Sequence, residues 1–299
     1  MASVKTTVDG RELTISNLDK VLYPATGFTK GDMIDYYTKV AGVMLPHVRD
    51  RPLTMKRFPD GVDGPSFFEK HTPARGPTWL RHVSVPSTRD DSAVDYSVVG
   101  DLPTLLWAAN LATIEFHVPL WHVGRRRTLP GPPDHMVFDL DPGEGTTIVE
   151  CCTVALHIVD VLTAQGLLCF AKTSGSKGLQ LYAPLKGRTS WDRSRDCTRD
   201  VALQLERLHP DLVVSTMEKS RRRNRVLIDW SQNHPAKTTV AAYSLRARPE
   251  PTVSTPVTWN EVHRCEESGD PALLRFAAPE VLDRIEQLGD LFAPVSDPQ

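Results

Sequence analysis

Hydrophobic residues in the second half of the chain follow two spacings. Short apolar runs at 135–140, 167–173, 179–185 and 225–230 predict buried strands. Between them, apolar residues recur at helical intervals, first behind Thr146 up to Gly166 and then from Cys197 to Leu208. The predicted order is strand, helix, strand, strand, helix, strand. This order is typical of an α+β sheet with helices on one side.

The first half of the chain carries clearer helix boundaries. A capping box at 29–32 predicts a helix start, and Asp101 is expected to cap a short helix that ends at Asn110. An edge strand is predicted after Pro52, and residues 114–118 predict another strand. The proline-rich stretch 129–133 predicts a boundary between an N-terminal module, 1–128, and a second module, 129–299.

Three aspartates stand out because they lie in or at the end of apolar runs. Asp139 and Asp141 are two residues apart on one predicted strand, so their side chains point to the same face. Asp229 ends another apolar run, and on a neighbouring strand it would bring a third carboxylate to that face. Two carboxylates about 4 Å apart repel by roughly 4 kcal/mol at an effective dielectric constant of 20. The pattern therefore favours a divalent-cation site over a stabilising cluster, and all-oxygen ligands suit Mg²⁺ or Mn²⁺.

Composition narrows the class of protein only moderately. The 299 residues are 40% hydrophobic and 24% charged, as in globular proteins, and the N-terminus shows no secretory signal. No apolar run approaches membrane-spanning length, so we expect a cytoplasmic protein without a membrane partner. Five cysteines without a C-x-x-C pair indicate reduced thiols. The net charge of −2 argues mildly against nucleic-acid binding, but basic residues concentrate at 125–127 and 221–225.

Several other residues have both a structural and a functional interpretation. The segment 174–178, Ser-Gly-Ser-Lys-Gly, is either an ordinary hairpin turn or a cradle for a triphosphate. His117 follows Glu115 in an apolar strand, where a satisfied core histidine is the usual explanation, and one of Phe67 and Phe68 is free to stack on a base. Lys30 lies in the first turn of its helix, where a lysine opposes the helix dipole unless an anion is bound nearby.

Taken together, these segments resemble the polymerase domain of bacterial ligase D, an end-joining repair enzyme of the archaeo-eukaryotic primase superfamily. The resemblance runs from about Leu13 to Leu291. The segments that carry it are 19–24 (DKVLYP), 67–70 (FFEK), 116–119 (FHVP), 137–142 (VFDLDP), 174–178 (SGSKG), 229–233 (DWSQN) and 243–246 (YSLR). The resemblance implies an α+β primase-like fold, in which an RRM-like catalytic sheet packs against the N-terminal α/β module as one compact domain.

The same resemblance implies roles for individual residues. The metal ligands would be Asp139, Asp141 and Asp229, holding two Mn²⁺ or Mg²⁺ ions. The nucleotide-binding residues would be Lys56, His117, Ser174, Lys177, Gln232 and Arg246, and the DNA-binding residues Asn17, Lys20, Lys30, Phe67, Phe68 and Arg222. Of these, Asn17, Lys20 and Lys30 would hold a 5′-phosphate at a gap or break.

The function that follows is a template-dependent nucleotidyltransferase that uses NTPs or dNTPs to extend primers or fill gaps at DNA ends. Many members of the family prefer ribonucleotides. Expected partners are gapped or recessed DNA with a 5′-phosphate, a separate DNA ligase and end-binding proteins. One alternative is a non-catalytic DNA-end-binding module. Another is a metal-dependent phosphoesterase or glycosyltransferase, which would not need the residues assigned to DNA.

Overall fold

The computed structural model describes residues 3–87, 92–124, 130–185, 187 and 189–296. The basic run 125–127 lies outside these residues. Contacts divide the chain into two units. Unit 1 comprises Met1–Gly131, Thr238–Val253 and Ala277–Gly289, and unit 2 comprises Pro132–Lys237, Ser254–Phe276 and Asp290–Gln299. Two segments from the C-terminal part of the chain, Thr238–Val253 and Ala277–Gly289, thus belong to unit 1. The predicted division into functional modules after residue 128 stays a prediction.

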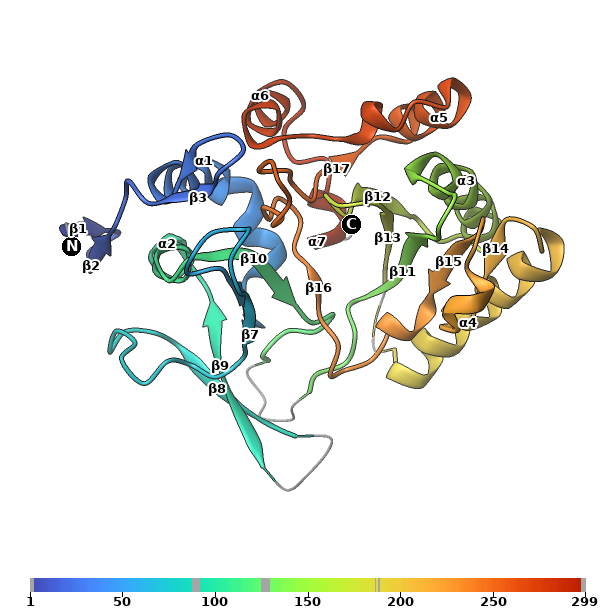
Figure 1. Ribbon diagram of the computed structural model, residues 1–299. Coiled ribbons are helices and arrows are strands. Elements are labelled where there is room, and N and C mark those ends of the chain that lie inside the picture. Colours follow the sequence, from blue (N-terminus) through green and yellow to red (C-terminus); the bar gives the residue numbers. More distant parts are fainter. Residues whose placement is uncertain (1–2, 88–91, 125–129, 186, 188, 297–299) are drawn as a thin grey trace. The chain divides into compact units, whose positions relative to one another are not determined.

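Unit 2 contains the predicted alternation of strands and helices (Figure 1). Its main elements are β11 (His135–Pro142), α3 (Ile148–Ala164), β12 (Phe170–Thr173), β13 (Leu179–Pro184), α4 (Trp191–Leu208), β14 (Val213–Val214), β15 (Val226–Asp229), β17 (Pro256–Val257), α5 (Trp259–Ser268) and α7 (Ala293–Ser296). Short 3-10 turns are η1 (Lys219–Arg221), η2 (Trp230–Gln232) and η3 (Pro271–Leu274).

The unit 2 sheet has the strand order β14-β15-β11-β13-β12-β17. Among its four central strands, β15, β11, β13 and β12, every adjacent pair is antiparallel, whereas the outer strand β14 runs parallel to β15. In the β-α-β-β-α-β unit, the first strand, β11, and the third, β13, therefore lie next to each other in the middle. The fourth strand, β15, lies outside β11, and the second, β12, lies outside β13. This is the ferredoxin-like arrangement. The α+β prediction is confirmed, as is the order of elements in this half.

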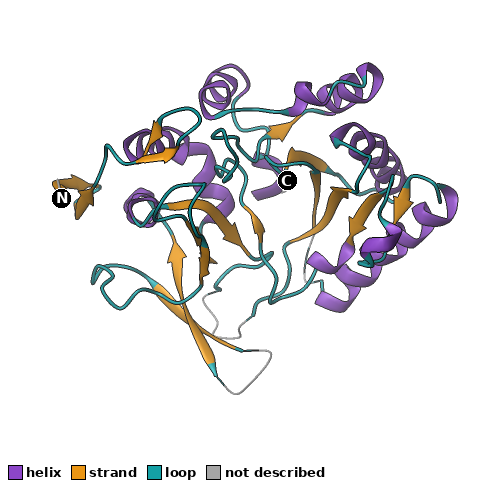
Figure 2. Cartoon of the chain, in the orientation of Figure 1, coloured by secondary structure: helices purple, strands orange, loops and turns teal. Residues whose placement is uncertain are grey.

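Alternation along the strands separates the two faces of this sheet. Phe138 and Leu140 of β11, Leu181 of β13 and Ile228 of β15 belong to the buried cluster that α3 and α4 complete. Successive side chains on a strand point to opposite faces, so Asp139 and Asp141 lie on the face away from α3 and α4. Figure 2 shows these two purple helices beside the orange strands of the sheet.

Local hydrogen bonds explain where α3 begins. Its N-cap is Thr147 rather than the predicted Thr146, and Thr147 forms a capping box with Glu150. The Thr146 hydroxyl instead donates to the carbonyl of Gly143 at 3.0 Å. Thr146 is thereby used to close the turn after β11, and the helix starts one residue later than predicted.

Unit 1 is built on a second sheet of order β16-β10-β6-β7. Its elements are β1 (Ser3–Val8), β2 (Arg11–Ser16), β3 (Val21–Tyr23), β4 (Phe28–Thr29), α1 (Lys30–Val48), β5 (Arg51–Pro52), β6 (Thr54–Arg57), β7 (Phe67–Glu69), β8 (His82–Pro86), β9 (Ala93–Val99), α2 (Leu102–Asn110), β10 (Thr113–Val118), β16 (Thr239–Val240) and α6 (Ala278–Leu288). The capping box at Thr29 and the Asp101 cap are confirmed.

The predicted edge strand after Pro52 is wrong. β6 lies between β10 and β7, so it is an interior strand of its sheet. Pro52 belongs to β5, which pairs with β9 in another sheet. Because Pro52 lies outside β6, its missing N–H removes no hydrogen bond between β6 and its neighbouring strands. Pro52 therefore does not indicate whether β6 is an edge strand.

Tyrosines of α1 and β3 hold the later segment of unit 1. The hydroxyl of Tyr36 donates to the carbonyl of Tyr243 at 2.9 Å, and that of Tyr23 donates to the carbonyl of Arg246 at 3.0 Å. Both rings are buried, so each hydroxyl needs such an acceptor. Residues separated by more than 200 positions are thus joined inside one unit.

Two further expectations concern cysteines and membranes. All five cysteines are free thiols, which confirms that this chain has no disulfide framework. Among the described residues, no helix has both the length and the apolar character that crossing a bilayer requires.

Candidate active site

The face of the unit 2 sheet opposite α3 and α4 gathers the predicted acidic residues. Asp139 of β11 is the direct cross-strand partner of Asp229 at the end of β15. Asp229 is buried, Asp139 is partly buried and Asp141 is exposed. The expectation that Asp229 lies on a strand next to Asp139 is therefore confirmed. Three carboxylates share one face of the sheet, as the two-residue spacing predicts.

Amide and hydroxyl donors surround two of these carboxylates. The Oδ1 atom of Asp229 accepts hydrogen bonds from the backbone N–H and the hydroxyl of Ser231, at 2.9 and 2.5 Å. The Nε2 atom of Gln232 lies 3.4 Å from both Asp139 Oδ2 and Asp229 Oδ2. A positively polarised amide group thus lies between the two acidic side chains.

The pKa of Asp139 reflects its burial and the negative charges of the neighbouring carboxylates. Burial, followed by the negative charge of Asp141, raises the pKa of Asp139 to about 7. A hydrogen bond from Gln180 acts in the opposite direction, and the charge of Asp229 adds to the increase. The carboxylates therefore repel one another, and a cation among them would remove this repulsion.

The donor set fits a hard divalent cation. Within the described ranges, no group of three or more His, Cys, Asp or Glu side chains is already close enough together to chelate an ion. The Gln232 amide nitrogen lies between Asp139 and Asp229 instead, and its partial positive charge faces both carboxylates as the charge of a cation would. Carboxylate oxygens without thiolate or imidazole partners favour Mg²⁺ or Mn²⁺ over Zn²⁺.

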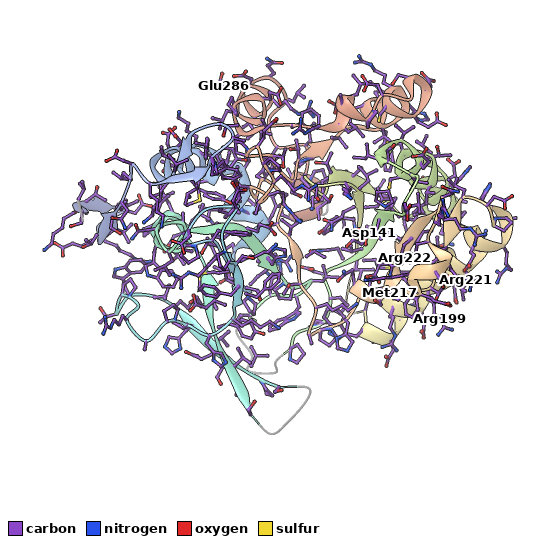
Figure 3. All side chains as sticks on the ribbon, in the orientation of Figure 1. Asp141, Arg199, Met217, Arg221, Arg222 and Glu286 are labelled. Carbon is purple, nitrogen blue, oxygen red and sulfur yellow. The ribbon has the colours of Figure 1, made fainter. Side chains whose placement is uncertain are left out.

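Glycines allow the loop that carries Arg222 to approach β11. A Cβ atom on Gly143 would lie 1.8 Å from the carbonyl oxygen of Arg222. The N–H of Gly143 donates to the carbonyl of Arg225 at 2.9 Å, which holds the two segments together. The Arg222 guanidinium donates to the carbonyl of Met217 at 2.8 Å, within its own loop (Figure 3).

The segment 174–178 forms a compact turn between β12 and β13. The Ser174 hydroxyl oxygen accepts hydrogen bonds from the N–H groups of Ser176 and Gly178, at 3.2 and 3.0 Å. A Cβ atom on Gly178 would lie 2.0 Å from the carbonyl oxygen of Leu140, so this glycine permits close packing on β11. Lys177 is exposed at the tip. The segment is therefore an ordinary hairpin turn, closed by hydrogen bonds to Ser174, that presents Lys177 at its tip.

A second polar cluster lies in unit 1, around the buried carboxylate of Glu115. His117 Nε2 is 2.9 Å from Glu115 Oε2, and a carboxylate only accepts, so this nitrogen carries the proton. Lys56 Nζ and Arg246 Nε lie 3.5 and 3.6 Å from Glu115 Oε1. Three of the predicted nucleotide-binding residues are thus held by one carboxylate.

The pKa values in this cluster follow from burial and charge. Burial acts to raise the pKa of Glu115, but the hydrogen bond from His117 and the charges of Arg246 and Lys56 outweigh it and lower the pKa to about 2. Burial lowers the pKa of His117, while Glu115 opposes this decrease. Glu115 is therefore a fixed negative charge that orients cationic side chains.

The two phenylalanines of β7 are both exposed. Arg57 lies over the ring of Phe67 at 5.2 Å, and Lys56 lies over that of Phe68 at 5.6 Å. The ring of Phe68 also contacts that of His117 edge to face, with centroids 5.5 Å apart. Phe68 thereby adjoins the Glu115 cluster, within unit 1.

Lys30 has a structural partner that the sequence pattern does not reveal. Its side chain is buried, and its ammonium donates to the carbonyl of Ser16 at 2.6 Å and to Asn110 Oδ1 at 2.7 Å. Burial, with the charges of Lys20 and Arg57, lowers the pKa of Lys30 to about 8. Lys20 itself pairs with Asp60 at 3.0 Å. The Ser16 carbonyl and Asn110 Oδ1 thus take two of the three donors of the Lys30 ammonium.

Backbone hydrogen bonds bring the segment of Asn17 to the start of α1. Asn17 has a positive φ of 56°, and its carbonyl accepts from the N–H of Lys20 at 3.1 Å. The carbonyl of Lys20 in turn accepts from the N–H of Lys30 at 2.8 Å. The three residues predicted to hold a 5′-phosphate therefore lie in one hydrogen-bonded turn of unit 1.

Three residues with central positions were not predicted as site residues from the sequence: Glu115, Lys172 and Gln180. Glu115 precedes His117 by two residues, so alternation already places both on one face. Lys172 and Gln180 are polar residues inside apolar strands, the same signal that identified Asp139. A polar residue inside an apolar strand is thus the signal that all three residues share with Asp139.

Comparison with known proteins gives consistent similarities. A family model described as the LigD primase-polymerase domain matches residues 29–292. The multifunctional non-homologous end joining DNA repair protein LigD of Mycobacterium tuberculosis H37Rv is 45% identical over 297 residues, covering 96% of this chain and 38% of that protein. The LigD protein of Mycolicibacterium smegmatis is 44% identical over 281 residues, covering 94% of this chain and 36% of that protein. The chain thus spans less than two-fifths of these relatives.

A solved structure gives the corresponding match in three dimensions. It is described as the polymerase domain from Mycobacterium tuberculosis ligase D in complex with DNA. It is 45% identical to this chain and has a TM-score of 0.89, covering 96% of this chain and 98% of that one. The α+β, primase-like fold class expected from the sequence is therefore confirmed.

Proposed function

Because this chain belongs to the LigD primase-polymerase domain family, we propose that it is a template-dependent nucleotidyltransferase that extends primers or fills short gaps at DNA ends. The observation that carries the proposal is the convergence of three carboxylates on the face of the unit 2 sheet opposite α3 and α4. A non-catalytic end-binding module would have no use for such a repulsive cluster. Double-strand break repair, at the nucleoid, is the setting that the family suggests.

The carboxylates would hold the divalent cations that this chemistry needs. Asp139, Asp141 and Asp229 are the proposed ligands, for two ions of Mn²⁺ or Mg²⁺. When bound, such ions activate the primer 3′-hydroxyl and neutralise the triphosphate. The protein's own part is to orient its ligands, and Ser231 does so by donating to one oxygen of Asp229.

The residues that we propose for binding the incoming nucleoside triphosphate are cationic and polar side chains. In unit 1, Glu115 fixes Lys56, His117 and Arg246, whose positive or donor groups suit phosphate oxygens. In unit 2, the proposed contacts are Ser174, Lys177 and Gln232. The proposed substrates are NTPs and dNTPs, with ribonucleotides preferred, as in many members of the family.

DNA would be recognised by its end and not by its sequence. We assign a 5′-phosphate to Asn17, Lys20 and Lys30, because contacts to phosphate carry no base information. Phe67 and Phe68 are exposed on β7 and offer faces on which template bases can stack. Arg222 would contact the primer end or the nucleotide. A separate DNA ligase and end-binding proteins would complete the repair.

Primer extension on gapped DNA with a 5′-phosphate tests this function directly. The expected result is template-dependent addition of one to a few nucleotides, faster with ribonucleotides than with deoxynucleotides and faster with Mn²⁺ than with Mg²⁺. Tight binding to the gapped DNA without incorporation under any of these conditions would favour the end-binding module instead.

Replacing Lys30 by alanine should weaken binding to gapped DNA mainly when the 5′-phosphate is present. The pKa of Lys30 is about 8, so the wild-type preference for the phosphate should fall as the pH rises above 8, by up to about tenfold per pH unit. The 5′-phosphate is already dianionic there, since its second pKa is about 6. Fluorescence anisotropy with phosphorylated and unphosphorylated DNA, from pH 7 to 9, measures both effects.

The Lys30→Ala variant provides its own control for the pH effect. Its residual preference for the phosphate should not depend on pH in this range, because the titrating group is gone. Equal losses of affinity for the two DNAs, or an unchanged pH profile in the variant, would remove Lys30 from the proposed pocket.

A further inference from the structure

Four polar residues form a row across the face of the unit 2 sheet opposite α3 and α4. Asp229 is the cross-strand partner of Asp139, Asp139 is that of Gln180, and Gln180 is that of Lys172. They come from four neighbouring strands, β15, β11, β13 and β12. The row connects the acidic cluster to a lysine whose side chain is completely buried.

Burying this lysine is not needed for the stability of the sheet. An ammonium group loses its hydration on burial, at a cost of several kcal/mol before partners are counted. Leucine or methionine would fill a comparable volume without that cost. The partners of Lys172 must therefore explain its presence, and they are Gln180 Oε1 at 2.5 Å, Ser254 Oγ at 2.7 Å and the Tyr182 ring at 5.5 Å.

The chemistry of the ammonium group fixes the orientation of Gln180. A lysine ammonium only donates hydrogen bonds, so the amide oxygen of Gln180 must face it. The amide nitrogen must then face the other way, and it donates to Asp139 Oδ1 at 3.0 Å. Without Lys172, the amide is free to turn its oxygen toward the carboxylate, which would repel Asp139.

The bond from Gln180 also makes the two oxygens of Asp139 unequal. Oδ1 accepts the 3.0 Å bond, whereas Oδ2 has the longer 3.4 Å approach of Gln232 Nε2, which is shared with Asp229. Oδ2 is thus the oxygen directed toward the other carboxylate of the cluster. The hydrogen bond that Gln180 donates to Oδ1 therefore determines that Oδ2 is the oxygen directed toward Asp229.

From this geometry we propose that Lys172 is a positioning residue, which acts through Gln180 to fix the orientation of Asp139 toward a divalent cation. The inference rests on the proposed function, because that function gives Asp139 its cation. Lys172 itself lies two strands away from Asp139, so the Gln180 amide carries the orienting effect, while the positive charge of Lys172 also acts directly to lower the pKa of Asp139.

The test is the affinity of the purified protein for Mn²⁺, measured by the electron paramagnetic resonance signal of the free ion. Lys172→Met keeps the length of the side chain but removes its donors, and Gln180→Glu keeps an oxygen for Lys172 but removes the N–H for Asp139. Each variant should weaken Mn²⁺ binding about 10- to 100-fold, the usual effect of losing an outer-shell partner. An Asp139→Ala protein identifies the binding that belongs to this site.

Ser254→Ala is the matched control. It removes another hydrogen bond of Lys172 but leaves the contacts between Lys172, Gln180 and Asp139. Its melting temperature should fall while its Mn²⁺ affinity stays within about twofold of wild type, since no partner of Asp139 is lost. A lysine that serves stability alone would give the same result for Lys172→Met, and that result would overturn the proposal.

The double variant Lys172→Met/Gln180→Met adds a second criterion. If Lys172 acts through Gln180, the double variant should bind Mn²⁺ about as weakly as Gln180→Met alone, since coupled residues are not additive. Fully additive losses would contradict the proposal. If Lys172→Met does not fold, Gln180→Glu carries the test by itself, and wild-type affinity in that variant overturns the proposal.

Failure of the proposed function would look different. Wild-type protein that binds Mn²⁺ through Asp139 but adds no nucleotide to any primer would refute the nucleotidyltransferase assignment and leave the positioning role intact. Wild-type protein that extends primers while Lys172→Met and Gln180→Glu keep full Mn²⁺ affinity would refute only the positioning role.

Discussion

Replacing Asp139 by alanine will reduce nucleotide addition by at least about 10³-fold, while binding to gapped DNA with a 5′-phosphate will change little. Cation-assisted charge stabilisation contributes several kcal/mol to such reactions, and each 1.36 kcal/mol is a factor of ten in rate. The proposed phosphate pocket lies in unit 1, and Asp139 lies in unit 2. Single-turnover primer extension and fluorescence anisotropy measure the two effects separately.

The metal-free protein offers an independent check of the same residue. Because the pKa of Asp139 is raised to about 7, its charged form is disfavoured in the folded state. Above pH 7, the carboxylate therefore opposes folding, and Asp139→Asn should melt at or above the wild-type temperature at pH 8.

The exposed Asp196 provides the control for the primer-extension experiment, since Asp196→Ala should leave extension unaffected. Extension by Asp139→Ala at the wild-type rate would refute the cation site.

Replacing Gly143 by alanine should produce the second large effect, a loss of about 1–3 kcal/mol or more in the free energy of unfolding. The new Cβ would lie 1.8 Å from the carbonyl oxygen of Arg222, and backbone atoms cannot rotate away as a side chain can. The loop that carries Arg222 must shift, so nucleotide addition should fall as well. Chemical denaturation and primer extension measure the two losses.

Gly42→Ala is the matched control for this substitution. Gly42 is exposed within α1, and a Cβ there would have no heavy atom within 4 Å. Alanine is the better helix former, so this variant should gain up to about 1 kcal/mol. The same chemical change is thus expected to have opposite signs at the two positions. Wild-type stability in Gly143→Ala would mean that the Arg222 loop can move from β11 without cost.

The features that the sequence predicted well are those with a local physical cause. The caps at Thr29 and Asp101 depend on residues within one helical turn, and the strands of unit 2 on runs of apolar residues. The pairing of Asp139 with Asp229 was a hypothesis about neighbouring strands, and strand register confirmed it. For the caps and the strands the information lies within a few residues of the feature, whereas the pairing of Asp139 with Asp229 joins segments 90 residues apart.

The features that the sequence did not predict depend on contacts between distant segments. The ammonium of Lys30 donates to Asn110, 80 residues away, a partner that its position at a helix start does not reveal. Likewise, Gln180 could be recognised as a partner of Asp139 only after the order β11-β13-β12 was known. No local pattern encodes such pairs, and this limit applies to most of the hydrogen bonds around the candidate site.

The discontinuous make-up of unit 1 restricts how this fold can be exchanged by recombination. A fragment of residues 1–131 would lack β16, and the hydroxyls of Tyr23 and Tyr36 would lose the carbonyl acceptors they have in 238–253. Buried hydroxyls without acceptors destabilise a protein by about 1–3 kcal/mol each. A single crossover cannot graft either unit onto a foreign chain, so the two halves are expected to be inherited together.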